Sequence, residues 1–326
     1  MRHQAPGSRT DTMTGEATMF DISFVTLTWN SERYVRNCFD SIITQCVTED
    51  LRFEIIVVDN GSRDGSVELV REYCTRFPDR IRLLALGGNR GTTYPRNLAL
   101  KQARSPIICI VDSDTEFLSG SLRPVLTLLA AHATLGIIAP RLILPDGSVQ
   151  HSVKRFPTLL DKLRKVPRIL AGHKATRDDF YRAFPFDCST HVETAISACW
   201  FLRADLLGSV GLLDEGIFYS PEDLDYSARV RDAGMRVVYY PHLTLLHHTQ
   251  QISHRRPLSR LSLSHLKGLV RYHLKHGGWL VRPAGGPMPW SAGDDVSKRL
   301  RREHVMPQEA TTGLRHGERS REVMRP

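Results

Sequence analysis

Two carboxylates lie directly after a short apolar stretch in the first half of the chain. Residues 107–111 are all apolar, as expected of a buried strand, and Asp112, Ser113 and Asp114 follow them. Ligands of open α/β sheets bind at the carboxyl ends of the strands. Mg²⁺ or Mn²⁺ commonly binds through one or two carboxylates together with substrate phosphate oxygens. Asp and Ser are also ordinary turn residues, so a simple strand-end turn stays open at this point.

A second acidic group opens a helix that we predict after Pro221. Glu222, Asp223 and Asp225 lie within four residues and follow an aromatic-rich turn. The helix dipole alone favours an acid at the start of a helix, which would explain one of the three. Two adjacent acids favour a general base that takes a proton from an incoming hydroxyl while a metal holds a leaving phosphate.

Two adjacent histidines, His247 and His248, end a late apolar segment. A histidine in such a place is often a surface residue or a satisfied core residue. His247 continues the apolar segment directly, as Asp112 does. Its neutral imidazole could therefore complete the coordination of the metal.

The segments that must carry these residues alternate between strand and helix. Apolar runs predict strands at 20–27, 53–58, 81–86 and 107–111, and apolar periodicity predicts helices at 31–46, 67–77 and 95–103, the first capped by Ser31. This alternation predicts an α/β protein with a mostly parallel, doubly wound central sheet. Further helices are predicted at 121–132 and after Pro221, and further strands at 136–144, 194–202, 237–240 and 243–248.

Composition narrows the class of protein. The chain has 326 residues and is 41% hydrophobic, which suits a full core. Its six cysteines include no C-x-x-C pair, which favours free thiols and argues against zinc. No apolar run approaches the roughly 18–20 residues of a membrane-spanning helix, and the polar N-terminus lacks the hydrophobic region of a secretory signal.

The net charge of +9 is unevenly placed. Residues 253–326 hold fifteen Lys and Arg against six Asp and Glu, so the residues before them sum to zero. The main body is therefore not a basic nucleic-acid-binding domain. The first predicted strand is followed by neither G-x-G-x-x-G nor a P-loop motif, which argues against a dinucleotide enzyme and a P-loop NTPase.

Six motifs in one order resemble family 2 glycosyltransferases of the GT-A fold. They are V-T-x-x-W-N from Val25, VVDNGSRDGS from Val57, N-x-G-x-x-x-x-R-N from Asn89, D-S-D from Asp112, P-E-D-x-D from Pro221 and L-H-H from Leu246. Within the family, the chain looks most like bacterial rhamnosyltransferases of surface polysaccharide synthesis. The resemblance covers about residues 22–276.

The resemblance implies an inverting, metal-dependent transfer of a sugar, with rhamnose as the first candidate. The donor is a nucleotide-diphosphate sugar, and the acceptor is a hydroxyl of a glycan or lipid-linked molecule. Asp223 is implied as the catalytic base with Glu222 beside it, and Asp112, Asp114 and His247 as the ligands of Mg²⁺ or Mn²⁺. The implied nucleotide-sugar contacts are Thr26, Asn30, Asp59, Gly91, Arg96, Asn97, Asp112 and Ser113. Proline at position 95, where such families often have alanine, could shift this loop.

We expect five parts along the chain. Residues 1–19 form a disordered leader, and residues 20–250 form the GT-A domain, with a nucleotide-sugar half at 20–118 and an acceptor half at 119–250. Residues 151–188 read as an insertion or lid. An amphipathic helical extension at 251–282 precedes a disordered basic tail at 283–326. The protein is expected in the cytoplasm, with the basic extension allowing peripheral contact with the anionic inner face of the membrane.

Two other functions remain open from the residues. A sugar-1-phosphate nucleotidylyltransferase also uses a related α/β domain and a metal, but it would carry a glycine-rich basic loop directly after the first strand. A non-catalytic binding module could use the basic tail, although it would leave the acidic groups unexplained.

Overall fold

The computed structural model describes residues 20–158, 160, 181, 184–249 and 260–278. The first part of the chain contains β1 (Ile22–Thr28), α1 (Glu32–Thr48), β2 (Phe53–Asp59), α2 (Ser66–Arg76), β3 (Ile81–Ala85), α3 (Thr93–Leu100) and β4 (Ile107–Asp112). The second part contains β5 (Thr115–Ser119), α4 (Leu122–Ala131), β6 (Leu135–Ile143), β7 (Val153–Lys154), β8 (Thr190–Val192), β9 (Thr194–Ala195), β10 (Cys199–Arg203), α7 (Leu206–Ser209), α8 (Glu222–Asp232), β11 (Arg236–His247) and α9 (Arg260–His276).

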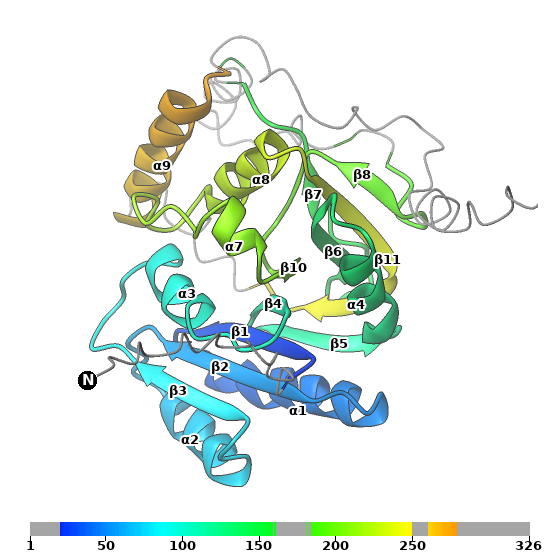
Figure 1. Cartoon of the computed structure of the whole chain (residues 1–326). Coiled ribbons are helices and arrows are strands. Elements are labelled where there is room, and N and C mark those ends of the chain that lie inside the picture. Colours follow the sequence, from blue (N-terminus) through cyan, green and yellow to red (C-terminus); the bar gives the residue numbers. More distant parts are fainter. Residues whose placement is uncertain (1–19, 159, 161–180, 182–183, 250–259, 279–326) are drawn as a thin grey trace, which may run out of the picture.

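One central sheet runs through the molecule in the order β3-β2-β1-β4-β10-β6-β11-β5, with β8 paired to β11 (Figure 1). Its first four strands are parallel. Beyond them β10 runs antiparallel to β4 and β6, whereas β11 is parallel to β6 and antiparallel to β5. The predicted α/β fold with a central, mostly parallel sheet is confirmed, and the mixed pairing is confined to its second half.

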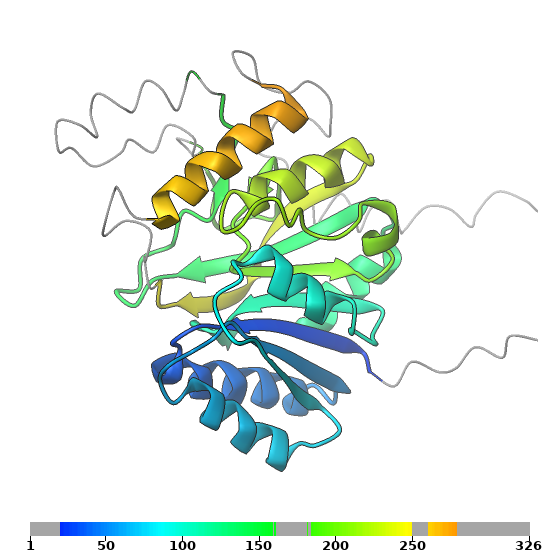
Figure 2. The same cartoon turned by 90° about the vertical axis from the view of Figure 1, so that its left-hand side faces the viewer.

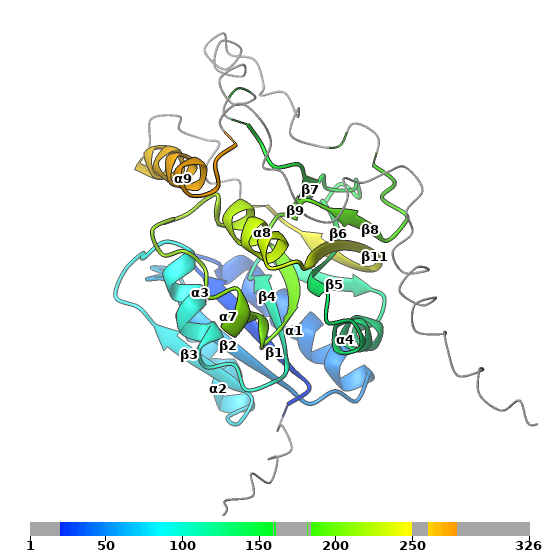
Figure 3. The same cartoon turned by 45° about the horizontal axis from the view of Figure 1, so that its top comes forward.

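The two faces of the sheet carry separate apolar cores. Phe24 of β1 packs in the core that includes α1 and α2, whereas its neighbour Val25 packs in the core that includes α3 and α8. Successive side chains of a strand point to opposite faces, and both faces are covered here (Figures 2 and 3). This explains why residues 53–58 and 107–111 are continuous apolar runs instead of alternating ones.

The structure differs from the predicted elements in several places, among them the unpredicted short strands β7 and β8. An unpredicted strand, β5, follows Asp114 and pairs with β11. The strands predicted at 237–240 and 243–248 form one strand, β11, with a register shift between Tyr240 and Thr244. The strand predicted at 194–202 is divided into β9 and β10. Ser31 precedes α1, but its hydroxyl makes no capping bond and instead accepts from Ser113 and from the N–H of Trp29.

Helix α9 lies beside α8, at the end of the molecule opposite α1 and α2 (Figures 1 and 2). Within the described residues, no helix is both long enough and apolar enough to span a membrane. The predicted leader at 1–19, residues 251–259, the tail at 283–326 and most of the lid predicted at 151–188 lie outside the described residues.

Candidate active site

Strand pairing brings the three predicted metal ligands together. Asp112 ends β4, Asp114 lies in the turn after it, and His247 ends β11. β11 pairs with β5 so that His247 is opposite Thr115, the residue after Asp114. Ligand atoms of Asp112, Asp114 and His247 lie within 4.8 Å of one another. Two carboxylates and an imidazole fit a divalent cation such as Mn²⁺ or Mg²⁺.

The histidine ring is held from both sides. Its Nε2 lies 3.5 Å from Oδ1 of Asp114, and its Nδ1 lies 2.8 Å from Oε1 of Gln150. Burial opposes protonation of His247, but the hydrogen bond and charge of Asp114 and the charge of Asp112 outweigh it, so its pKa is raised. Gln150 therefore orients the ring from outside the cluster, as partners of metal-binding histidines commonly do.

Arg96 connects this cluster to the acids of α8. The Arg96 side chain is 4% exposed. Its Nη2 donates to Oδ1 of Asp112 at 2.6 Å, and its Nη1 donates to Oε1 of Glu222 at 3.2 Å and to Ser197 Oγ at 2.9 Å. Burial raises the pKa of Asp112, with Arg96 lowering it and the charge of Asp114 raising it. One buried cation thus joins two acids that lie 110 positions apart in the chain.

The two adjacent acids of α8 have different surroundings. Burial, followed by the charge of Asp223, raises the pKa of Glu222 to about 7, although Arg96 and Ser197 act against this. Asp223 lies 3.6 Å from the Nζ of Lys154, and its Oδ1 accepts from the backbone N–H of Leu224 at 2.9 Å. Glu222 faces the arginine bridge, whereas Asp223 is not part of it, and the role of Asp223 as the catalytic base stays a prediction.

The loops after β1 and β2 hold each other in place. Oδ2 of Asp59 accepts from the N–H groups of Gly61 and Ser62, and its Oδ1 accepts from the hydroxyls of Ser62 and Thr28. Asn30, with a positive φ of 51°, accepts from the N–H of Arg63. The carboxylate of Asp59 therefore orders its own loop, and its contact with a nucleotide base stays a prediction.

The glycine-rich loop before α3 contacts both the loop after β2 and the loop before α8. Asn60 donates to the carbonyl of Gly91 at 2.8 Å. Gly91 has a φ of 84°, and a Cβ on it would lie 2.0 Å from the carbonyl oxygen of Phe218. Only glycine fits here. Beside this loop lies an open cavity of about 380 Å³, which is lined by Leu86, Gly87, Arg90 and Tyr94.

Two predicted nucleotide contacts, Asn97 and Thr26, are buried in the structure. The amide of Asn97 donates to the carbonyl of Leu213 and to Glu215, and it accepts from the N–H of Leu213. Asn97 thus positions the loop before α8, and its contact with the nucleotide stays a prediction. Thr26 is 1% exposed, and its hydroxyl has no hydrogen-bond partner among the described residues. Its contact with the donor stays a prediction.

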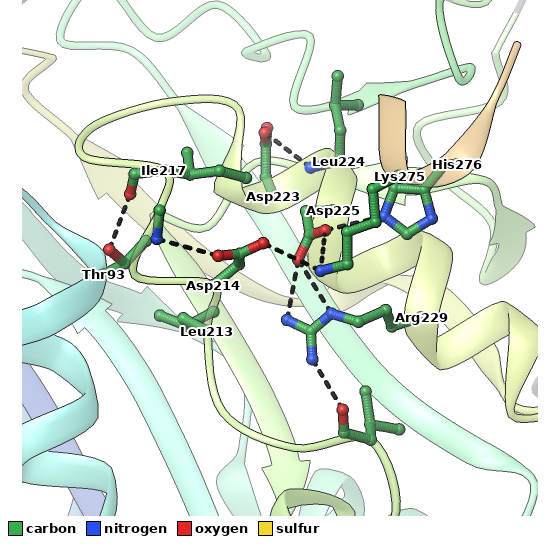
Figure 4. A network of polar contacts seen from close by, with 12 residues as sticks. Thr93, Leu213, Asp214, Ile217, Asp223, Leu224, Asp225, Arg229, Lys275 and His276 are labelled. Atoms are coloured by element: carbon green, nitrogen blue, oxygen red, sulfur yellow. Dashed lines mark hydrogen bonds and ion pairs between the residues drawn. The ribbon is translucent and has the colours of Figure 1, made fainter. Parts of the chain in front are cut away.

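Helix α9 fastens the loop before α8 and α8 itself (Figure 4). Asp214 accepts from Arg271 at 2.9 and 3.0 Å and from Lys275 at 3.1 Å. Asp225, whose side chain is 1% exposed, pairs with Lys275 at 2.7 Å and His276 at 2.8 Å. Burial alone would raise the pKa of Asp225, but the bonds from His276 and Lys275 outweigh it and lower that pKa. We call this group, Asp214, Asp225, Arg271, Lys275 and His276, the α9 clamp.

Sequence reasoning missed Gln150, Ser197 and Lys154, which contact His247, Glu222 and Asp223 respectively. No local signal marks them, because nothing in the residues beside them distinguishes them from other polar residues of the chain. Their roles depend on which strands come together.

The family assignment agrees with this geometry. Residues 23–207, more than half of the chain, match the family model described as Glycosyl transferase family 2. The chain belongs to this family and is a glycosyltransferase. The predicted resemblance is confirmed, and the alternative of a non-catalytic binding module is not supported.

Two related proteins can be compared with this chain individually. An N-acetylglucosaminyl-diphospho-decaprenol L-rhamnosyltransferase of Mycobacterium tuberculosis (strain ATCC 25618 / H37Rv) is 27% identical over 244 residues, which cover 70% of this chain and 77% of the relative. The O-antigen biosynthesis protein RfbC of Myxococcus xanthus is 27% identical over 66% of this chain, but this match spans only 16% of RfbC.

A solved structure supports the fold alone. The crystal structure of GalNAc-T7 with UDP, GalNAc and Mn²⁺ has a TM-score of 0.61 and 16% sequence identity, and the match covers 88% of this chain and 55% of that chain. At this identity the similarity confirms the α/β glycosyltransferase fold and assigns no substrate.

Proposed function

We propose that the chain is an inverting, metal-dependent glycosyltransferase of bacterial surface polysaccharide synthesis. It would move a hexose, with rhamnose as first candidate, from a nucleotide-diphosphate sugar to a hydroxyl of a lipid-linked glycan. The observation that carries the proposal is the convergence of Asp112, Asp114 and His247, joined through Arg96 to Glu222 beside Asp223. The name of the mycobacterial relative, an N-acetylglucosaminyl-diphospho-decaprenol L-rhamnosyltransferase, supports a lipid-linked acceptor.

In this proposal the cluster of Asp112, Asp114 and His247 stabilises the leaving group. A divalent cation bound by Asp112, Asp114 and His247 would neutralise charge that builds on the departing diphosphate. Gln150 keeps the imidazole of His247 in place. Arg96 adds a buried positive charge beside Asp112 and keeps the cluster in register with α8.

We assign Asp223 as the base that activates the acceptor. Its carboxylate would take the proton of the acceptor hydroxyl as that oxygen bonds to the anomeric carbon and the bond from the anomeric carbon to the diphosphate oxygen breaks. A single displacement inverts the anomeric centre and needs no covalent intermediate. The Nζ of Lys154, 3.6 Å from Oδ2 of Asp223, places a positive charge beside this carboxylate.

The first test is hydrolysis of sugar nucleotides by the full chain without an acceptor. We expect slow release of nucleoside diphosphate that depends on Mn²⁺ or Mg²⁺ and stops with a chelator. Thermal shifts with dTDP, UDP and GDP in the presence of Mn²⁺ should show which nucleotide the donor site accepts. Release of pyrophosphate from a nucleoside triphosphate and a sugar 1-phosphate, with no sugar-nucleotide hydrolysis, would instead identify a nucleotidylyltransferase.

A further inference from the structure

The outer face of α9 is an exposed apolar stripe. Leu263, Leu266, Val270 and Leu274 are 55%, 58%, 45% and 72% exposed. They are spaced by three, four and four residues, which places them along one side of a helix. They make up half of the eight large hydrophobic residues that are notably exposed among the described residues. We call these four residues the α9 stripe.

The other side of α9 is fixed to the domain. Tyr272 is fully buried, and Gly268 packs so closely that a Cβ on it would lie 2.3 Å from the carbonyl oxygen of Ser220. The α9 clamp holds the helix to the loop before α8 and to α8 (Figure 4). Since these contacts set the rotation of the helix, the α9 stripe is held outward.

The charged residues of α9 itself are all basic, and two of them, Arg271 and Lys275, pair with acids of the α9 clamp. Residues 260–278 contain four Lys and Arg and no Asp or Glu, and the acid-free stretch of the sequence runs from residue 233 to 293. Lys267 is exposed and Arg271, although clamped, keeps 52% of its side chain exposed. An apolar stripe on a helix whose own charges are all positive matches a surface with an apolar interior and anionic head groups.

We propose that the α9 stripe docks the protein on an anionic lipid bilayer. Leu263, Leu266, Val270 and Leu274 enter the boundary between head groups and acyl chains, while the basic residues beside them meet the head groups. The helix lies in the plane of the membrane because its inner side stays clamped to the domain. Docking through α9 brings α8, with Glu222 and Asp223, to the membrane side of the enzyme. Only this last consequence, reach to a lipid-linked acceptor, rests on the proposed function.

The test compares matched exposed apolar residues on the full-length chain. Flotation with vesicles of phosphatidylcholine containing phosphatidylglycerol, and with pure phosphatidylcholine, gives the partition coefficient of each variant. The stripe variant is Leu266→Gln with Leu274→Gln. The control is Val47→Gln with Leu118→Gln, which replaces residues that are 64% and 50% exposed on α1 and β5. All four positions are exposed, so these substitutions should change the stability of the fold little.

The wild type and the control variant should bind the anionic vesicles, and binding should weaken on neutral vesicles and at high salt. The stripe variant should bind roughly 10- to 100-fold less well, since two partly buried leucine side chains are lost from the interface. The basic residues at 279–326 are identical in all three proteins, so that difference reports the stripe and not the tail. Equal binding of the stripe and control variants would overturn the proposal. The proposal would also be overturned if the wild type bound neither kind of vesicle, or if light scattering showed that it dimerises through the stripe.

Donor hydrolysis separates this inference from the proposed function. The stripe variant should hydrolyse sugar nucleotide at the wild-type rate, because its changed residues lie outside the catalytic group. A chain that binds anionic vesicles through the stripe but hydrolyses no sugar nucleotide would refute the proposed function and leave the docking surface standing. A chain that hydrolyses donor but never binds vesicles would do the reverse.

Discussion

Arg96 donates a 2.6 Å hydrogen bond to Asp112 from a side chain that is 4% exposed. The same guanidinium reaches Glu222 at 3.2 Å. The candidate metal ligands at the tip of β4 and the acids at the start of α8 are therefore held by one buried charge. Any change to this charge should affect both halves of the site together.

Replacing Arg96 with methionine should damage both stability and activity. The change leaves the buried Glu222 and the half-buried Asp112 without their cation, so we expect a loss of about 3–5 kcal/mol in the free energy of unfolding, measured in urea. Transfer should fall roughly 10²-fold or more, since the two halves lose their register. The control, Arg36→Met, removes an exposed pair with Glu72 and should cost less than about 1 kcal/mol. Equal costs for the two variants would refute the bridging role.

Replacing Asp223 with asparagine should remove the base and keep the fold. Donor binding, followed by thermal shift with nucleotide diphosphate, should survive, while transfer to acceptor falls about 10²- to 10⁴-fold. Asp232→Asn changes an exposed acid at the end of the same helix and should leave transfer near the wild-type rate. Near-normal turnover of Asp223→Asn would exclude this residue as the base.

The two adjacent histidines should differ sharply in metal binding. His247 lies in the acidic cluster, whereas His248 pairs with Glu116 at 2.6 Å outside it. We expect His247→Ala to weaken Mn²⁺ binding at least 10- to 100-fold by calorimetry, because it removes a direct ligand where even indirect partners have effects of that size. His248→Ala should bind Mn²⁺ much as the wild type does. The same weakening in both variants would argue against the assignment of His247.

Glu222 should give the enzyme a pH dependence near neutrality. Its pKa is raised to about 7, mainly by burial, and only its ionised form pairs fully with Arg96. The ratio kcat/KM should therefore rise as pH increases through about 7, and Glu222→Gln should lose this rise along with much of the activity.

Stability should respond to the same group in the opposite direction. Because the folded protein holds the Glu222 proton more tightly than the unfolded chain, stability falls as pH rises from 4.5, the ordinary value, to about 7. Urea unfolding across this window should show a smaller decline for Glu222→Gln than for the wild type. A kcat/KM profile of the wild type that is flat around pH 7 would show that the ionisation of Glu222 does not control activity.

Gly268 should tolerate no side chain. A Cβ there would lie 2.3 Å from the Ser220 carbonyl oxygen, so Gly268→Ala should destabilise the protein by about 1–3 kcal/mol and lower transfer, as the turn before Glu222 shifts. Gly208→Ala in α7 is the control, since its Cβ would meet no atom within 4 Å. There alanine should be neutral or stabilising by up to about 1 kcal/mol. Similar effects at both glycines would mean that α9 does not support the turn.

Much of the site could be predicted because its signals are local. The apolar run before Asp112, the D-S-D triplet and the acids after Pro221 each lie within a few residues. The structure places them at the end of β4 and at the start of α8. The grouping of Asp112, Asp114 and His247 was predicted as a metal site, and their ligand atoms do converge. The contact of Asn97 with the loop before α8 was not predicted, because neighbours in a helix point in different directions and only packing shows which loop each one meets.

The amino-acid sequence by itself determined the alternation of strands and helices, the acidic tips and the basic, acid-free extension, because hydrophobic period and charge can be read over short windows. Tertiary structure alone decided that Gln150 holds His247, that Arg96 joins Asp112 to Glu222 and that α9 turns four apolar residues outward. These relations join residues far apart in the chain. They depend on the register of β11 against β5 and on the close contact of α9 with the turn before α8, and no local pattern encodes either.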